Sequence, residues 1–285
     1  MRSFYLPALA HVAAFLGGSL GWALVVGITA GIAVAMAGGG VPPPTDTWDG
    51  RWVGLLSIVQ ISGFALWALV LTAALPPADS AAAFRWPRTA DLRQRLALSH
   101  LAPQHLALAF GGSLTVWMLP SWGATRLAEW MGSDGGSLLW IGELLTDGPL
   151  LDRGVMTLAV VLSAPVFEEL IFRGYLWAVF ERLGGPMLAL GATTLLFAAY
   201  HLDPLHVVTL LPTALFLGWC RWASRSLWPA IAAHFGNNAI SVVVVSAQPD
   251  ALEQGMPLGL GLAGATVTVV CCALAARLSK PTEPA

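Results

Sequence analysis

Three charged side chains stand inside a long apolar run of this chain. The run reads Pro165-Val-Phe-Glu-Glu-Leu-Ile-Phe-Arg-Gly174, and it places Glu168, Glu169 and Arg173 in a stretch long enough to span a membrane. On insertion scales, a charge at the centre of a bilayer costs roughly 2.5–3.5 kcal/mol. Such groups are kept when they pair with one another, face a wet cavity or take part in chemistry. The run therefore predicts a buried polar site in a membrane protein.

The spacing of these charges separates their roles. Glu169 and Arg173 are four residues apart with the acid first, which is the favourable order for an ion pair on a helix. Glu168 points about a hundred degrees away around the helix, so one guanidinium cannot pair equally well with both acids. We expect Glu169 and Arg173 to be a structural pair and Glu168 to be available for chemistry. The alternative is that Glu168 is structural as well.

Composition indicates a polytopic membrane protein. Of the 285 residues, 56% are hydrophobic and 11% are charged, whereas soluble domains carry about 25% charged residues. The net charge of −2, with no basic stripe, argues against a nucleic-acid partner. Cys220, Cys271 and Cys272 lack the spacing of a disulfide framework or a metal site. We expect them to fill space, with lipidation of the adjacent pair as the alternative.

The predicted fold class is all-α, with about eight transmembrane helices. The apolar segments of spanning length cover roughly residues 12–37, 52–76, 99–119, 154–181, 186–202, 205–220, 227–247 and 257–277. The fifth and sixth are short, and are either tilted or joined by a turn within the membrane. The expected organisation is helices 1–3 with their loops in 1–153, a catalytic core in 154–247, and a final helix with a short tail in 248–285.

Basic residues predict the orientation in the membrane. If the N-terminus is inside, ten of the 14 Lys and Arg residues fall on the inner side and three on the outer side, with Arg173 within the membrane. This bias follows the positive-inside rule. It predicts a multi-pass protein of the cell membrane with both termini in the cytoplasm.

Two later apolar segments carry polar pairs at helical spacing. One ends Phe197-Ala-Ala-Tyr-His201, and the other contains His234-Phe-Gly-Asn-Asn238. Residues four apart share a helix face, so His234 and Asn238 can both face Glu168 and His201. These groups suffice to activate water and to stabilise an oxyanion. Taken singly, His201 is equally explained as a helix C-cap, and His234 with Asn238 as a hydrogen-bonded contact between helices.

The predicted helix boundaries leave these groups at different depths. Glu168 falls near mid-membrane, His201 near the outer end of its helix and His234 in the inner half, so the depths differ by roughly 10–20 Å at 1.5 Å per residue. The groups meet only if the fifth helix is displaced or tilted, or if the predicted boundaries are wrong. Pro165 is expected to kink the fourth helix just before the carboxylates.

Three neighbours of these motifs are expected to be structural. Asp203 and His206 flank the second motif and are interpreted as turn residues, with a supporting role at the site as the alternative. Asn237 adjoins Asn238 and is interpreted as its structural neighbour.

In this order, the motifs resemble those of the CPBP family, the CAAX proteases and bacteriocin-processing enzymes also called the Abi family. That family is marked by E-E-x-x-x-R, F-x-x-x-H and H-x-x-x-N/B on successive membrane helices. This chain reads Glu168-Glu169-x-x-x-Arg173, Phe197-x-x-x-His201 and His234-x-x-x-Asn238. The resemblance covers about residues 160–240. It implies an intramembrane endopeptidase, a hydrolase whose partners are the lipid bilayer and a membrane-associated peptide or protein, of prenylated CAAX type or bacteriocin-like.

The resemblance also implies roles for single residues. Glu168 is the general base that activates water, His201 helps to bind or orient that water, and His234 and Asn238 stabilise the oxyanion. Members are often labelled metalloproteases, and Glu168, His201 and His234 could instead be three zinc ligands with an open fourth position. Glu168 would then not be free to act as base, so we favour a mechanism that requires no metal.

Two other classes of function stay open. One is a non-proteolytic membrane immunity or regulatory protein that binds a partner. The other is a proton-coupled transporter that uses Glu168 and the histidines as a relay. Among intramembrane proteases, the H-E-x-x-H class is excluded because no histidine in the chain is followed by Glu.

Overall fold

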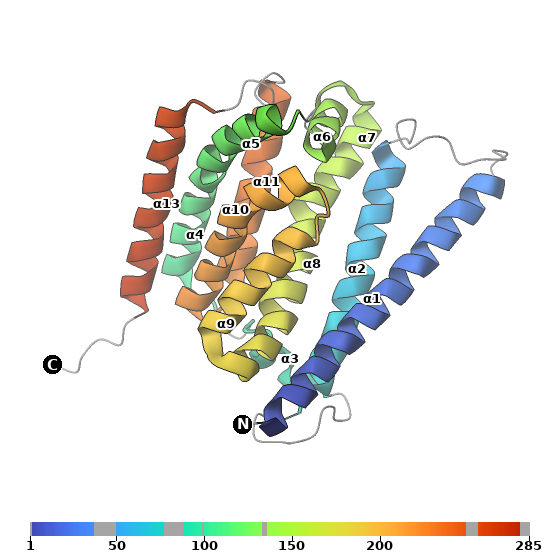
Figure 1. Cartoon of the computed structure of the whole chain (residues 1–285), viewed down its shortest axis with the longest axis vertical. Helices are drawn as coiled ribbons and strands as arrows, with labels where there is room; N and C mark the ends of the chain where they lie inside the picture. Colours follow the sequence, from blue (N-terminus) through green and yellow to red (C-terminus); the bar gives the residue numbers. More distant parts are fainter. Residues whose placement is uncertain are drawn as a thin grey trace.

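The computed structural model is a bundle of helices (Figure 1). It describes residues 2–36, 50–76, 88–98, 100–132, 136–248 and 256–279, and these ranges contain no strand, which confirms the all-α class. The helices are α1 (Arg2–Met36), α2 (Gly50–Ala74), α3 (Leu92–Arg95), α4 (Pro103–Val116), α5 (Met118–Met131), α6 (Gly136–Asp147), α7 (Leu150–Thr157), α8 (Ala164–Glu169), α9 (Trp177–Ala199), α10 (Pro204–Ser224), α11 (Trp228–Ala247) and α13 (Leu258–Leu278). Shorter turns are 3-10 helical at Thr89–Asp91 and π-helical at Leu158–Ser163 and Leu170–Leu176.

Six helical stretches in the described ranges are long and apolar enough to cross a membrane. The expected number was about eight, and the difference arises at two places. The stretch Leu150–Ala199 counts as one of the six although Gly184 and Gly185 interrupt it, and it contains both the fourth and the fifth predicted spans. The third predicted span, 99–119, is wrong as a single helix, because α4 ends after 14 residues and Trp117 leads into α5. Pro120 explains the break, since it has no N–H to donate to the carbonyl of Val116.

The chain reverses direction within α9, at Gly184 and Gly185. Gly185 has φ +81°, a left-handed conformation that favours glycine, and Pro186 opens the returning arm as proline often does in a first helical turn. Glu168 stands 16 residues before Gly184, and His201 stands 16 residues after Gly185. Because the two arms are equal in length, both residues reach a similar depth. The expected difference in depth between them is therefore wrong.

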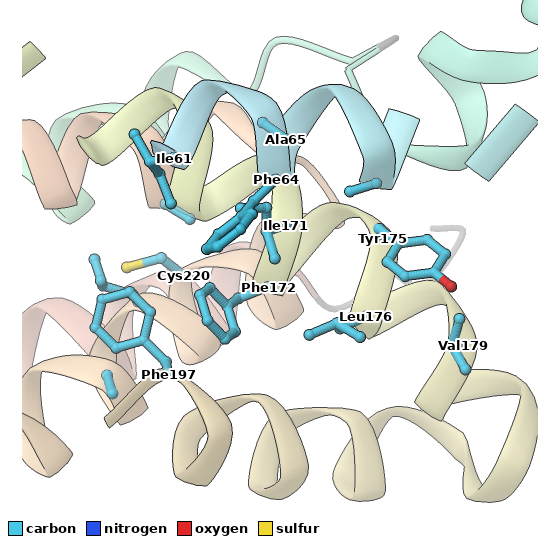
Figure 2. Close-up of a cluster of buried hydrophobic side chains, with 14 of the residues drawn as sticks. Ile61, Phe64, Ala65, Ile171, Phe172, Tyr175, Leu176, Val179, Phe197 and Cys220 are labelled. Atoms are coloured by element: carbon cyan, nitrogen blue, oxygen red, sulfur yellow. The ribbon is translucent and has the colours of Figure 1, made fainter. Parts of the chain in front are cut away.

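The core lies where α2 packs against the stretch from α8 to α9. Figure 2 shows Phe64 of α2 together with Phe172 and with Phe197 from the returning arm of α9. The rings of Phe172 and Phe197 meet edge to face, with centroids 5.2 Å apart. Within a membrane, such contacts stabilise through close packing rather than through exclusion of water. This cluster packs the stretch before Gly184 against the stretch after Gly185, close to Glu169 and Arg173.

A reciprocal pair of tryptophans joins α1 to α2. Trp22 and Trp67 each donate the indole N–H to a backbone carbonyl of the opposite helix, at 3.4 and 3.0 Å. Each indole also lies on a glycine of that helix. A Cβ atom at Gly63 or Gly18 would come within 2.0 or 2.1 Å of the indole nitrogen. Beyond this contact the two helices diverge, and α1 begins at the same end of the bundle at which α13 finishes (Figure 1).

Candidate active site

One cavity brings together the side chains expected at the site. It has a volume of about 900 Å³, and its walls come from α2, α5 to α7 and the stretch from α8 to α11. Glu168, His201, His234 and Asn238 all line it. The segment 120–153 falls between two of the predicted spans, and it contributes to the wall because it is largely helical, as α5, α6 and the start of α7.

Glu169 holds two partners with one oxygen. Its Oε1 accepts a hydrogen bond from Nη1 of Arg173 at 3.0 Å and one from Nδ1 of His234 at 3.0 Å. Arg173 also donates to the carbonyl of Ala214 at 2.9 Å, and its guanidinium lies 4.2 Å from the centre of the Phe197 ring. The expected ion pair is therefore present and fully buried. The sequence did not indicate that Glu169 also fixes the ring of His234.

Glu168 and His234 face each other at the polar end of the cavity. Oε2 of Glu168 and Nε2 of His234 are 3.9 Å apart, which is too far for a direct hydrogen bond. The gap allows both atoms to contact one small molecule such as water. Because Nδ1 of His234 donates to a carboxylate, the ring is held with Nε2 toward Glu168.

His201 lies in the turn between α9 and α10, outside both spans. Its Nδ1 donates to the carbonyl of Phe197 at 3.0 Å, so the helix-capping interpretation holds for this nitrogen. Nε2 is left as an acceptor. Burial lowers the pKa of the His201 imidazole, although the hydrogen bond to Phe197 acts in the opposite direction. The ring is therefore neutral near pH 7 and can accept a hydrogen bond from a water molecule.

The turn after His201 places a second imidazole in the cavity. The rings of His201 and His206 are 4.7 Å apart, and both line the cavity. Asp203 caps α10 by accepting hydrogen bonds from the backbone N–H groups of Leu205 and His206, at 3.0 and 3.2 Å. Leu202 has φ +59°, a conformation that non-glycine residues rarely adopt. Asp203 is thus the expected turn residue, and His206 is both a turn residue and a neighbour of the site.

Asn238 is held by a backbone carbonyl in the π-helical turn Leu158–Ser163. Its Nδ2 donates to the carbonyl of Val160 at 2.8 Å. At π-helical spacing that carbonyl would pair with the N–H of residue 165, which is a proline and has none. The expected disturbance at Pro165 therefore appears as a π-helical turn with one carbonyl left for Asn238. Asn237 donates to Oδ1 of Asn238 at 3.1 Å, and Nδ2 of Asn238 keeps one further N–H.

The alternative zinc site does not fit this arrangement. Nowhere in the described part of the chain are three His, Cys, Asp or Glu side chains placed to bind one metal ion. We derive no step through a metal, and the expectation that none is required stays a prediction.

Comparison with known proteins points to the same segment. Residues 151–240 match the family model described as type II CAAX prenyl endopeptidase Rce1-like. The match covers just under a third of the chain, runs from α7 into α11 and contains all three motifs. No curated protein and no solved structure gave a significant match. The family match and the three motifs lie in the same segment, and over residues 151–240 the chain is similar to the CPBP family of membrane proteases.

Proposed function

We propose that the protein hydrolyses a peptide bond in a membrane-associated substrate, with a water molecule activated by Glu168. The observation that carries this proposal is the contrast between the two adjacent carboxylates. Glu169 is buried, and its Oε1 is held by Arg173 and His234. Glu168 lines the cavity, and within the described chain no group donates a hydrogen bond to it at ordinary distance. A carboxylate that faces a cavity and is not tied down is suited to accept a proton.

The proposed reaction proceeds through one tetrahedral intermediate. Glu168 takes a proton from water while Nε2 of His201 accepts the other hydrogen of that water and orients it. The water oxygen bonds to the carbonyl carbon, and the remaining N–H of Asn238 stabilises the resulting oxyanion. Nε2 of His234 also donates to the oxyanion when both nitrogens of the ring carry a proton. Glu168 then passes its proton to the leaving nitrogen as the C–N bond breaks. Since water is the nucleophile, no covalent enzyme intermediate forms.

The cavity suggests the class of substrate. Its volume of about 900 Å³ lies at the upper end of the range for small-ligand sites, about 300–1,000 Å³. Most of its lining is apolar, including Ile58, Ile61, Leu145, Val242 and Val245. These features suit an apolar peptide segment, of the prenylated CAAX type or bacteriocin-like. The proposed location is the cell membrane with both termini cytoplasmic.

Cleavage of a fluorogenic peptide library by the purified protein in detergent tests the proposal. Prenylated and unprenylated peptides are compared, each with and without a chelator. We expect cleavage by the wild type at a single bond, insensitive to the chelator and abolished in Glu168→Gln. Chelator sensitivity that zinc restores would contradict the metal-free mechanism. A Glu168→Gln protein that keeps the cellular effect of the wild type would instead favour a binding or immunity protein.

A further inference from the structure

Gln60 is an amide in the middle of the apolar helix α2. It belongs to a stripe at helical spacing, Val53, Ser57, Gln60 and Phe64, on one face of that helix. The first three of these residues line the same cavity as Glu168. Helix α2 lies outside the segment that matches the family model. Gln60 is therefore a polar group that a different part of the chain contributes to the cavity.

No described group of the protein hydrogen-bonds to the amide of Gln60. In the described ranges it makes no hydrogen bond, whereas its neighbour Ser57 donates to the carbonyl of Val53 at 2.8 Å. An amide without a partner in apolar surroundings is unfavourable. Polar side chains at membrane depth typically face a cavity and mark the path of a substrate. The carboxamide of Gln60 therefore calls for a ligand with both a donor and an acceptor.

The position of Gln60 relative to the proposed chemistry follows from its helix. Phe64 lies one turn further along the same face, and its ring centroid is 6.3 Å from that of Tyr200. Tyr200 is adjacent to His201, so Phe64 marks the level of the proposed water site. Gln60 is then one turn away, about 6 Å along the axis. At 3.3 Å per residue, that distance corresponds to about two residues of an extended peptide.

We propose that Gln60 binds the main chain of the substrate about two residues from the bond that is cut. A peptide group offers one N–H and one C=O, and the carboxamide of glutamine offers the matching acceptor and donor. An apolar substrate has few side-chain groups to bind, so its main chain is the available partner. This inference rests on the proposed hydrolysis, and it assigns substrate positioning to a helix outside the family segment.

Ester-substituted substrates test this contact directly. For one peptide that the wild type cleaves, each N–H within three residues of the cut is replaced in turn by an ester oxygen. The proteins compared are the wild type, Gln60→Met, which keeps the length of the side chain, and Ser62→Ala as the matched control. Ser62 belongs to α2 but is not among the residues that line the cavity, and its hydroxyl donates within the helix to the carbonyl of Val59 at 3.0 Å.

We expect one ester position, about two residues from the cut, to lower kcat/KM of the wild type by about fivefold to tenfold, the value of one hydrogen bond. Gln60→Met should show a similar loss with the unmodified peptide, mostly in KM, and no further loss with that ester. Ser62→Ala should behave as the wild type does. Equal ester penalties in the wild type and Gln60→Met at every position would overturn the Gln60 proposal alone. A folded wild type that neither binds nor cleaves any peptide would overturn the proposed function, and this inference with it.

Discussion

The two sides of the cavity are built differently. On the side from α8 to α11, polar groups are locked in place, with Glu169 bridging Arg173 and His234 and with Asn238 held to a backbone carbonyl. The side made by α2, α5 and α6 is mainly apolar, and its amide at Gln60 is open to the cavity. Catalysis requires groups held to a fraction of an ångström, whereas an apolar wall tolerates substrates of different shape. The family match covers the locked side alone.

The sharpest test of the locked side is Glu168→Gln. This change keeps the shape of the side chain and removes the proton acceptor, so we expect a loss of at least about a thousandfold in kcat, within the range for a general base. The melting temperature should change little, because no described group donates a hydrogen bond to Glu168. Steady-state cleavage and thermal unfolding in detergent measure the two effects. Residual cleavage near the wild-type rate would show that another group activates water.

Glu169→Gln should affect stability more than any other change in the locked side. It leaves the guanidinium of Arg173 buried without a full counter-charge, and breaking a buried pair typically costs about 3–5 kcal/mol. Activity should also fall, because Nδ1 of His234 loses its carboxylate. A lowered melting temperature together with lost cleavage is the expected result.

Replacing both members of the pair separates these two effects. Glu169→Leu combined with Arg173→Leu removes both buried charges, and such replacements are often neutral for stability. We expect the double variant to regain most of the melting temperature but not the activity. Recovery of both would mean that the ring of His234 needs no partner at Nδ1.

Asn238→Leu tests the proposed oxyanion site. Loss of one oxyanion donor typically lowers kcat by about a hundredfold to a thousandfold, and KM should change less. Asn237→Leu should cost roughly tenfold, since Asn237 acts by orienting Asn238 through one hydrogen bond. Equal losses in the two variants would favour a purely structural role for both amides. Kinetics on the same peptide provide the comparison.

The sequence predicted the members of the site because each motif is local. Pairs such as His234 and Asn238 follow from helical periodicity alone, and so does the ion pair of Glu169 with Arg173. The hydrogen bond from His234 to Glu169 could not be predicted from the sequence, because it joins residues 65 positions apart on different helices. The role of each residue in the chemistry stays a prediction.

The depth of the site was predicted wrongly for a reason that the sequence contains. Apolar length alone predicts the wrong helix boundaries, whereas Gly184, Gly185 and Pro186 mark the point at which the chain reverses. Counting from that point gives Glu168 and His201 equal arms. Apart from Pro165, no local sequence pattern predicts the π-helical turns on either side of α8. These turns depend on how neighbouring helices bind the backbone carbonyls that lose their usual helical partner.

The smallest expected effect concerns α1, which contributes none of its described residues to the cavity. A Cβ atom at Gly18 would meet the indole of Trp67 at 2.1 Å, whereas one at Gly17 meets nothing within 4 Å. Gly18→Ala should therefore destabilise the α1–α2 contact by about 1–3 kcal/mol, as overpacking does. Gly17→Ala should leave the melting temperature unchanged or raise it, because alanine favours helix.

Both glycine variants should cleave peptide at a rate within about twofold of the wild type, because α1 lies outside both walls of the cavity and affects stability rather than chemistry. A twofold change in rate corresponds to under about 0.5 kcal/mol in the activation free energy. Measuring turnover well below the melting temperature separates the two effects. If Gly18→Ala lost activity while still folded, α1 would have to set the position of α2, and through it the open side of the cavity. The arrangement of the two sides of the cavity would then also depend on the contact between α1 and α2 that Trp22 and Trp67 make.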